Sequence, residues 1–331
     1  MSEARFDVVG IGSAIVDVIA HAEDSFLSKH DVSKGTMHLW SEESQPDALY
    51  KDIGPAVEAS GGSAANTMAG VASLGGKPAF IGKTKADQLG RIFARDIQSI
   101  GVHYETEPLS EGPATARCII LVTPDAQRTM FTYLGASGAL SATDMNKDLI
   151  AASKILYIEG YQWDLPETKK AIVSACETAK RSGGKVALTL SDPFVVERHR
   201  NDLFDLVNQH VDTIFANEIE IKTLFRLNSF DEAVEAIEGR VEIAALTRGA
   251  EGAVTVTKDK LIQTPASPMG KIIDTTGAGD LYAAGFLFGY TRGDDLESCA
   301  NIGALAAGEV ISHLGARPEV SLKGLVAEHG Y

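Results

Sequence analysis

Short apolar runs alternate with longer amphipathic segments along most of the chain. Five runs rich in Val, Ile, Leu and Phe have the length of buried strands and lie at 77–83, 154–160, 185–191, 211–217 and 242–249. Three segments with an apolar residue at every third or fourth position predict helices at 86–101, 166–183 and 218–227. Strands joined by such long crossovers pair in parallel, so the pattern predicts a mostly parallel α/β sheet with helices on both faces.

Two segments depart from this alternation. Residues 116–135 form two runs of Thr, Val, Ile and Phe around a TPDAQR turn with no helix between them, which predicts a hairpin. Residues 14–42 contain extended apolar pieces around a polar middle. The segments at about 14–42 and 112–136 therefore predict a small β-sheet, inserted as a lid in a single domain that spans residues 1–331.

Composition and charge limit the kinds of partner. The chain has 331 residues, 44% of them hydrophobic, which is enough for a large core and a cleft. A net charge of -15 opposes binding to nucleic acid or to an anionic membrane, because such binding needs a basic face. No run reaches the roughly 18 apolar residues of a membrane helix. Three cysteines share no CxxC spacing, which argues against a zinc site or a disulfide framework. We expect a cytoplasmic protein with small-molecule partners.

The stretch DTTGAGD at 274–280 combines glycines, a helix start and an acid. The helix that Gly277 and Gly279 open leaves its first N–H groups without intrahelical partners, and its dipole favours an anion such as a phosphate. Asp280 lies where a carboxylate could take the proton of an attacking hydroxyl. The alternative is that Asp280 only complements the helix dipole. The uncharged run LYAAGFLFGY that follows predicts a helix lying close against a sheet.

Polar residues in apolar or glycine-rich surroundings are further candidates. In SGGSAANTMAGVASLGG at 60–76, Gly61 and Gly62 would let the backbone approach a ligand while Asn66 hydrogen-bonds its hydroxyls. Tight helix packing is the alternative. Asp17, within GSAIVDVIA, either caps a turn or faces a polar ligand, because a buried carboxylate without a partner is costly.

Two strand ends carry residues suited to a nucleotide. Asn217 and Glu220, three residues apart in FANEIEIK, predict either a capping box or oxygen donors for Mg²⁺ or its waters. Thr247, Gly249 and Gly252 in LTRGAEGAV fit either nucleotide contact or a turn into the next strand. The chain has no GxxxxGK[ST] phosphate loop.

Taken together, these stretches resemble the PfkB family of ribokinase-like sugar and nucleoside kinases. DTTGAGD is similar to the C-terminal motif of the family and GGSAANTMAGVASLGG to its N-terminal motif, and the resemblance follows nearly the whole chain in order. It implies a ribokinase-like three-layer αβα core with a small β lid. It also implies ATP-dependent phosphorylation of a primary hydroxyl group.

The resemblance implies roles for individual residues. Asp280 is similar to the catalytic base of the family. The anion hole would be formed by Gly277, Ala278 and Gly279. The sugar hydroxyls would be held by Ser13, Asp17, Gly62, Ser63 and Asn66.

The nucleotide side is implied in the same way. ATP would lie against Thr247, Gly249 and Gly252. Mg²⁺ would be organised through its waters by Asn217 and Glu220. Asp274 lies where some members bind a monovalent cation such as K⁺.

Several stretches are most similar to adenosine kinases, among them ASGGSAANT, LTLSDPF and FANEIE. In QRTMFTYLGA, Arg128 matches an arginine that meets the transferring phosphate; the alternative is a solvated arginine at a hairpin end. Ser13 departs from an Asn among the ribose contacts, and Ala304 departs from a polar residue near the ATP adenine. Tyr161, Trp163 and Phe194 could hold a purine or belong to the core.

The resemblance therefore implies transfer of a phosphate from ATP, with Mg²⁺, to the 5′-hydroxyl of adenosine. The alternatives are a kinase of the same fold that acts on ribose, fructose or a related sugar, and a non-catalytic nucleotide or nucleoside sensor. Adenosine kinases are mostly monomers. An apolar outward face on the 116–135 hairpin would instead favour a homodimer, in which two lids pair.

Overall fold

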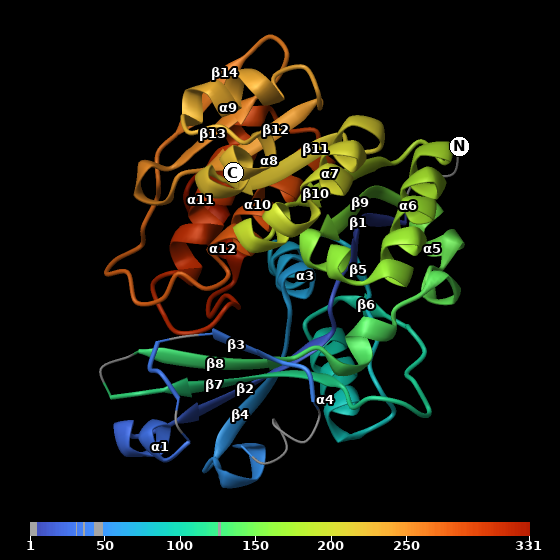
Figure 1. Ribbon diagram of the computed structural model, residues 1–331. Helices are drawn as coiled ribbons and strands as arrows, with labels where there is room; N and C mark the ends of the chain where they lie inside the picture. The colour runs from blue at the N-terminus through green and yellow to red at the C-terminus, as the bar shows by residue number, and fades with distance from the viewer. Residues whose placement is uncertain (1–4, 31, 36, 43–48, 125–126) are drawn as a thin grey trace.

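The computed structural model describes residues 5–30, 32–35, 37–42, 49–124 and 127–331, and these residues contain two β-sheets (Figure 1). The larger sheet has the strand order β14 (Leu261–Thr264), β13 (Ala253–Val256), β12 (Ile243–Thr247), β11 (Thr213–Asn217), β10 (Lys185–Thr189), β9 (Ser153–Glu159), β1 (Phe6–Ile11), β5 (Pro78–Ile81), β6 (His103–Tyr104). Neighbours from β12 to β6 pair in parallel, whereas β13 and β14 are antiparallel. The predicted mostly parallel sheet is confirmed.

Helices cover both faces of this sheet. One face packs against α5 (Lys147–Ala151), α6 (Pro166–Arg181), α7 (Pro193–Gln209), α8 (Glu218–Phe225) and α9 (Phe230–Ile237). The other packs against α3 (Ser63–Ser73), α4 (Gln88–Ser99), α10 (Ala278–Arg292) and α11 (Leu296–Val310), and α12 (Leu322–Glu328) packs beside α11. Successive residues of β1 point to opposite faces: Val9 packs in the apolar cluster of the first set of helices, and Val8 packs in that of the second set. The result is a three-layer αβα core.

Helix α10 lies against the sheet, as predicted, but its small residues make their closest contacts elsewhere. Its small residues face other helices: a Cβ on Gly285 would lie 2.6 Å from the Ile302 carbonyl oxygen of α11. A Cβ on Gly70 of α3 would likewise lie 2.6 Å from the Ala284 Cβ. The sheet is reached by the large Phe286, whose ring lies 5.6 Å from that of Phe215. Small residues therefore let three helices approach one another and fix the start of α10.

The smaller sheet lies below the core in Figure 1. Its strand order is β3 (Met37–Trp40), β8 (Arg128–Tyr133), β7 (Ala116–Val122), β2 (Ile15–His21), β4 (Ala56–Gly61), with α1 (Asp24–Lys29) beside it. β7 and β8 form the predicted hairpin, and residues 125 and 126 of its turn lie outside the described residues. The predicted segments omitted β4, an edge strand whose AVEASG sequence begins with exposed residues and so has no clear apolar pattern.

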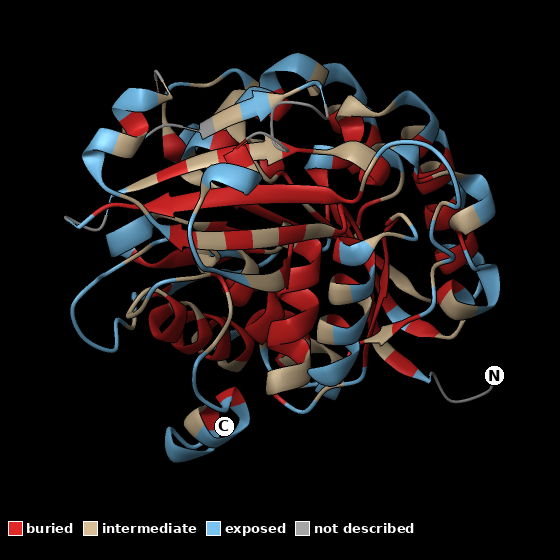
Figure 2. Cartoon of the chain, turned by 90° about the horizontal axis from the view of Figure 1, so that it is seen from below, coloured by how far each residue is buried: buried red, intermediate tan, exposed pale blue. Residues whose placement is uncertain are grey.

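The chain itself covers the face of the small sheet that points away from the core. Ile119, Leu121 and Phe131 lie on that face, in one apolar cluster with Leu27 and Leu49. Figure 2 looks onto this side and shows strands that are mostly buried, bordered by exposed helix and loop segments. Within the described residues, the apolar outward face that would favour pairing of two lids is therefore already covered.

Other features of the described residues bear on the expected partners. No helix there has the length and apolar character needed to cross a bilayer. No group of three or more His, Cys, Asp or Glu side chains there is arranged to hold a metal ion directly. The three cysteines are buried and unpaired.

Candidate active site

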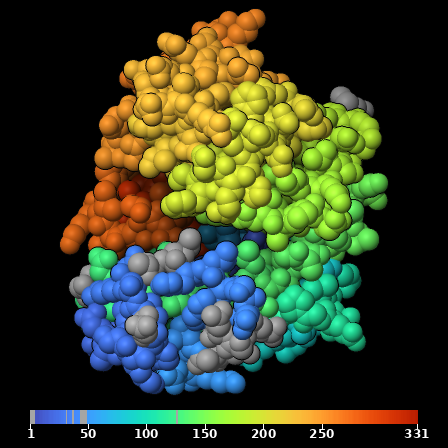
Figure 3. Space-filling model, in the orientation of Figure 1, coloured from blue at the N-terminus to red at the C-terminus, as the bar shows by residue number. Residues whose placement is uncertain are grey.

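A cleft of about 640 Å³ lies between the small sheet and the carboxyl ends of the central strands, and Figure 3 shows the surface hollowed there. Ser13 follows β1, Glu159 ends β9, Asn217 ends β11 and Thr247 ends β12, and all four line the cleft. The strand order reverses at β1, which lies between β5 and β9. Open parallel sheets bind ligands at such a point, where neighbouring connections diverge.

The N-terminus of α10 opens into this cleft. Gly277 has a φ of +79°, which favours glycine, and a Cβ there would lie 2.8 Å from Cα of Ala316. The Ala278 N–H donates to the Thr275 carbonyl at 3.2 Å and is not free for an anion. The N–H groups of Gly277, Gly279 and Asp280 have no acceptor among the described residues. The expected anion hole of residues 277–279 is thus corrected: the free donors are 277, 279 and 280, because the turn at Thr275 occupies the amide between them.

Asp280 also lines the cleft and is held by α3. The Ser63 hydroxyl donates to its Oδ1 at 2.6 Å, and Asn66 Nδ2 donates to its Oδ2 at 3.1 Å. Burial raises the pKa of Asp280 to about 7, opposed by these two hydrogen bonds and reinforced by the Glu159 charge. A carboxylate with a pKa near neutrality is suited to accept a proton. Ser63, Asn66 and Gly62 all line the cleft, as their predicted role requires.

Asp17 faces the cleft from β2 in the small sheet. Among the described residues, none donates a hydrogen bond to its carboxylate, so its oxygens are open to a ligand in the cleft. Burial raises the pKa of Asp17 to about 6, while Arg317 and Arg128 act in the opposite direction. Asp17 therefore does not cap a turn, and it can accept hydrogen bonds from hydroxyl groups.

Glu159, which was not among the predicted site residues, organises the hydrogen bonds beneath the cleft. Its fully buried carboxylate accepts from the Ser13 N–H at 2.7 Å and the Ala64 N–H at 2.8 Å. Gln162 Nε2 donates to it at 2.8 Å and to the Ser13 hydroxyl at 2.8 Å. Burial raises the pKa of Glu159, and these hydrogen bonds lower it. An acid that ends an apolar strand, in KILYIEG, was the signal available in the sequence.

Arg128 connects the small sheet to the turn that precedes α10. Its side chain is 9% exposed, and its Nη1 lies 2.7 Å from Asp274 Oδ2, which argues against a solvated hairpin arginine. Arg128 Nη1 also donates to the Thr276 hydroxyl at 3.3 Å, whereas Nε and Nη2 are buried without a partner. Two guanidinium nitrogens thus remain without an acceptor, although Arg128 itself does not line the cleft.

Asp274 is occupied by protein donors rather than open to a cation. Its Oδ1 accepts from the Thr276 N–H at 3.0 Å and hydroxyl at 2.7 Å, and its Oδ2 accepts from the Gly315 N–H at 3.0 Å. The Arg128 guanidinium balances its charge. Asp274 therefore fixes the turn before α10, and it does not line the cleft.

Asn217 and Glu220 form the capping box that was the simpler of the two predictions. Asn217 Oδ1 accepts from the Glu220 N–H at 2.9 Å, and Glu220 accepts from the Asn217 N–H at 2.9 Å and from Nδ2 at 2.7 Å. Burial raises the pKa of Glu220 to about 7. Both residues line the cleft beside Asp192, so their oxygens fit the waters of a bound Mg²⁺. Of the other nucleotide candidates, Thr247 lines the cleft, whereas Gly249 and Gly252 shape the turn from β12 to β13.

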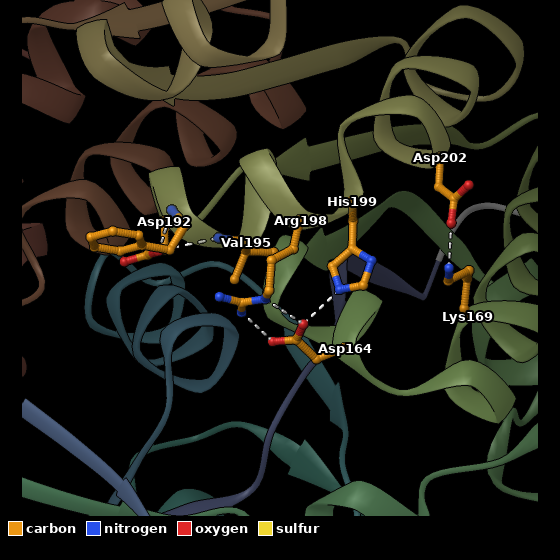
Figure 4. Close-up of polar contacts among 8 residues, drawn as sticks. Asp164, Lys169, Asp192, Val195, Arg198, His199 and Asp202 are labelled. Carbon is orange, nitrogen blue, oxygen red and sulfur yellow. Dashed lines mark hydrogen bonds and ion pairs between the residues drawn. The ribbon is translucent and has the colours of Figure 1, made fainter.

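Apolar and aromatic side chains form the far wall of the cleft. Phe194, 74% exposed, and Tyr161 line it, whereas Trp163 is buried in the core beneath α6 and α7. Ala304 is buried in α11 and does not line the cleft. Figure 4 shows the polar border of this wall, where Arg198 donates to both carboxylate oxygens of Asp164 and His199 lies 2.6 Å from Oδ1.

Comparison with known proteins agrees with this geometry. The sequence pattern described as "pfkB family carbohydrate kinase" matches residues 43–322. The chain belongs to this family. A pfkB family kinase transfers phosphate to an alcohol group, which argues against the non-catalytic sensor, and membership implies ATP as the donor, typically with Mg²⁺.

Two solved structures and one curated relative show what this pfkB family kinase is similar to. The adenosine kinase from Sinorhizobium meliloti is 48% identical, with a TM-score of 0.90 over 99% of this chain and 100% of that one. A probable sugar kinase protein from Rhizobium etli is 45% identical, with a TM-score of 0.91 over 99% of each chain. The adenosine kinase of Saccharomyces cerevisiae is 27% identical over 93% of this chain and 95% of its own length.

Proposed function

We propose that this pfkB family kinase phosphorylates the 5′-hydroxyl of adenosine. The observation that carries the proposal is that polar and apolar side chains line the same cleft. Asp17, Asn66 and Asp280 supply polar groups, to which hydroxyl groups would bind. A larger set of apolar and aromatic side chains also lines it: Ile15, Leu39, Met130, Leu134, Tyr161, Leu165 and Phe194. A free sugar has no apolar surface to cover these side chains, whereas a purine has two faces for them.

The reaction follows from the groups in the cleft. Asp17 and Asn66 hold the sugar hydroxyls, and Asp280 accepts the proton of the 5′-hydroxyl as its oxygen attacks the γ-phosphorus. The bond between that phosphorus and the β,γ-bridging oxygen breaks, so the products are AMP and ADP. The free N–H groups of Gly277 and Gly279, with Arg128, stabilise the charge on the transferring phosphoryl group.

Bound Mg²⁺ would neutralise charge on the ATP phosphates, and Asn217 and Glu220 would hold its waters. Movement of the small sheet toward the core would exclude water from the cleft. We expect the enzyme to act as a monomer, because the outward face of the small sheet is covered by its own chain.

A sugar kinase is the second candidate, because the Rhizobium etli relative is described as a probable sugar kinase. Measurement of ADP formation with adenosine, inosine, ribose and fructose, each with ATP and Mg²⁺, distinguishes the two. We expect kcat/KM for adenosine to exceed that for either sugar by at least about a hundredfold, which corresponds to burial of a base worth about 3 kcal/mol. Turnover with ribose or fructose and none with adenosine would refute the proposal.

A further inference from the structure

Arg317 lies in the loop between α11 and α12 and has no role in the proposed chemistry so far. Its Nη2 donates to the Ser60 carbonyl oxygen at 2.7 Å and contacts the Ser60 hydroxyl at 3.1 Å. Its Nε and Nη1 are buried with no hydrogen-bond partner among the described residues. Burial lowers the pKa of Arg317 to about 10, so the side chain is still charged at neutral pH. A buried cation with unused donors is costly unless a nearby anion or ligand compensates it.

Ser60 is where β4 of the small sheet returns to the core. Asp96 of α4 accepts from the Ser60 N–H at 2.7 Å and from its hydroxyl at 2.6 Å. Asp96 thus binds the Ser60 N–H and hydroxyl, whereas Arg317 binds the Ser60 carbonyl oxygen and hydroxyl. We call the set of Ser60, Asp96 and Arg317 the Ser60 junction.

The Ser60 junction is directly adjacent to Asp17. Ala59 of β4 pairs with Asp17 of β2, and a Cβ on Gly61 would lie 2.3 Å from Asp17 Oδ2. A shift of the β4 end would thus displace the carboxylate that faces the cleft.

The charges around Asp17 come from several elements. Arg317 approaches from the C-terminal loop and Arg128 from β8, and both favour the ionised carboxylate. Cys118 of β7 pairs with Asp17, and burial raises the pKa of its thiol to about 12, so it stays neutral. Arg317 also interacts electrostatically with Asp96, its main charged partner, and with Asp280.

We propose that Arg317 is a positioning residue for substrate hydroxyls: it fixes the β4 end at Ser60 and so the place of the neighbouring Asp17, which accepts those hydroxyls. The inference rests on the proposed function for the role of Asp17, whereas the contact with Ser60 can be tested without any substrate. The sequence holds no local signal for this contact, because Arg317 and Ser60 are 257 residues apart.

The contact is tested by amide hydrogen exchange of the ligand-free protein, followed by mass spectrometry on peptides that cover 56–62. We expect R317M to increase exchange in β4 by about tenfold, the effect of losing one charged hydrogen bond. The matched control is R181M, which removes an exposed arginine at the end of α6 and should leave these amides unchanged. S60A keeps the backbone acceptor, so it should increase exchange by less than R317M does. If R317M does not fold, S60A tests the contact in its place.

The charge is tested by kinetics with adenosine. We expect R317M to raise the KM for adenosine by about tenfold or more and to leave the KM for ATP within about twofold. The pH below which the adenosine KM rises should move upward in R317M, because Asp17 loses a neighbouring cation. R317K keeps the charge but not the paired donors, so it should restore this pH dependence while β4 exchange stays fast.

The outcomes separate the two proposals. If the wild-type protein phosphorylates sugars and not adenosine, the proposed function fails, and the exchange of residues 56–62 still decides the role of the Ser60 junction. If R317M matches R181M in β4 exchange and in the KM for the acceptor that is used, the inference about Arg317 is overturned. Equal effects of R317M and R317K on the pH dependence would overturn the effect of the Arg317 charge on Asp17.

Discussion

The Ser63 hydroxyl sets how readily Asp280 gives up its proton, and its removal should shift the pH dependence of the reaction. It donates to Asp280 Oδ1 at 2.6 Å and stabilises the ionised carboxylate. A hydrogen bond to a charged group contributes about 1.5–3 kcal/mol, and one pKa unit corresponds to about 1.4 kcal/mol. Water in the cleft replaces part of the lost bond, so we expect S63A to raise the pKa of Asp280 by about one unit.

The assay is kcat/KM with adenosine between pH 5 and 9. In the wild-type protein, the pKa of about 7 predicts a rate that falls about tenfold for each pH unit below 7. S63A should therefore be about tenfold slower than wild type at pH 6 and nearly equal to it at pH 9. The control is S174A, a serine exposed on α6, which should not change the profile. A loss in S63A that is the same at every pH would refute the reasoning.

Three further predictions concern the same cleft. D280N should be more stable than wild type at pH 8. Folding raises the pKa of Asp280 from 3.8 to about 7, so the stability that protonated Asp280 contributes is present below about pH 4 and lost as pH rises through 7. This difference in pKa corresponds to about 4 kcal/mol, which we halve to about 2 kcal/mol for solvent screening in the cleft. Urea unfolding at pH 4 and 8 should show the gain only at pH 8, and an equal gain at both would contradict it. F194A should raise the KM for adenosine by about tenfold and leave the melting temperature unchanged, because Phe194 is 74% exposed; a lower melting temperature with an unchanged KM would assign it to the core instead. G277A should cost about 2 kcal/mol of stability, because φ is +79° and Ala316 occupies the space, whereas G279A, with nothing within 4 Å, should cost little; equal losses in urea unfolding would show that α10 does not begin as described.

The core was predictable because its signal is local. Strands such as β9 and β10 show their burial as continuous apolar runs, and the capping box of Asn217 and Glu220 spans three residues. The edge strand β4 was missed for the same reason: only its last two residues are buried, so burial leaves little pattern.

The connections that assemble the cleft were not predictable, because they join distant parts of the chain. Ser63 and Asp280 are 217 residues apart, and Ser13 and Glu159 are 146 apart. Motifs indicated which residues matter at Asp280 and Asn66 but not that the two hydrogen-bond each other. The Ala278 N–H was not predictable for a different reason. Its hydrogen bond to the Thr275 carbonyl depends on the conformation of the turn before the helix, which the sequence pattern does not specify.

The central claim is that Asp280 removes the proton of an alcohol held at the start of α10. It is tested most directly by single-turnover transfer of phosphate from ATP to adenosine in wild type and D280N, with the adenosine Kd of each measured by calorimetry. We predict a rate at least about a hundredfold lower in D280N, with Kd within about threefold of wild type. A transfer rate within about threefold of wild type would contradict the account.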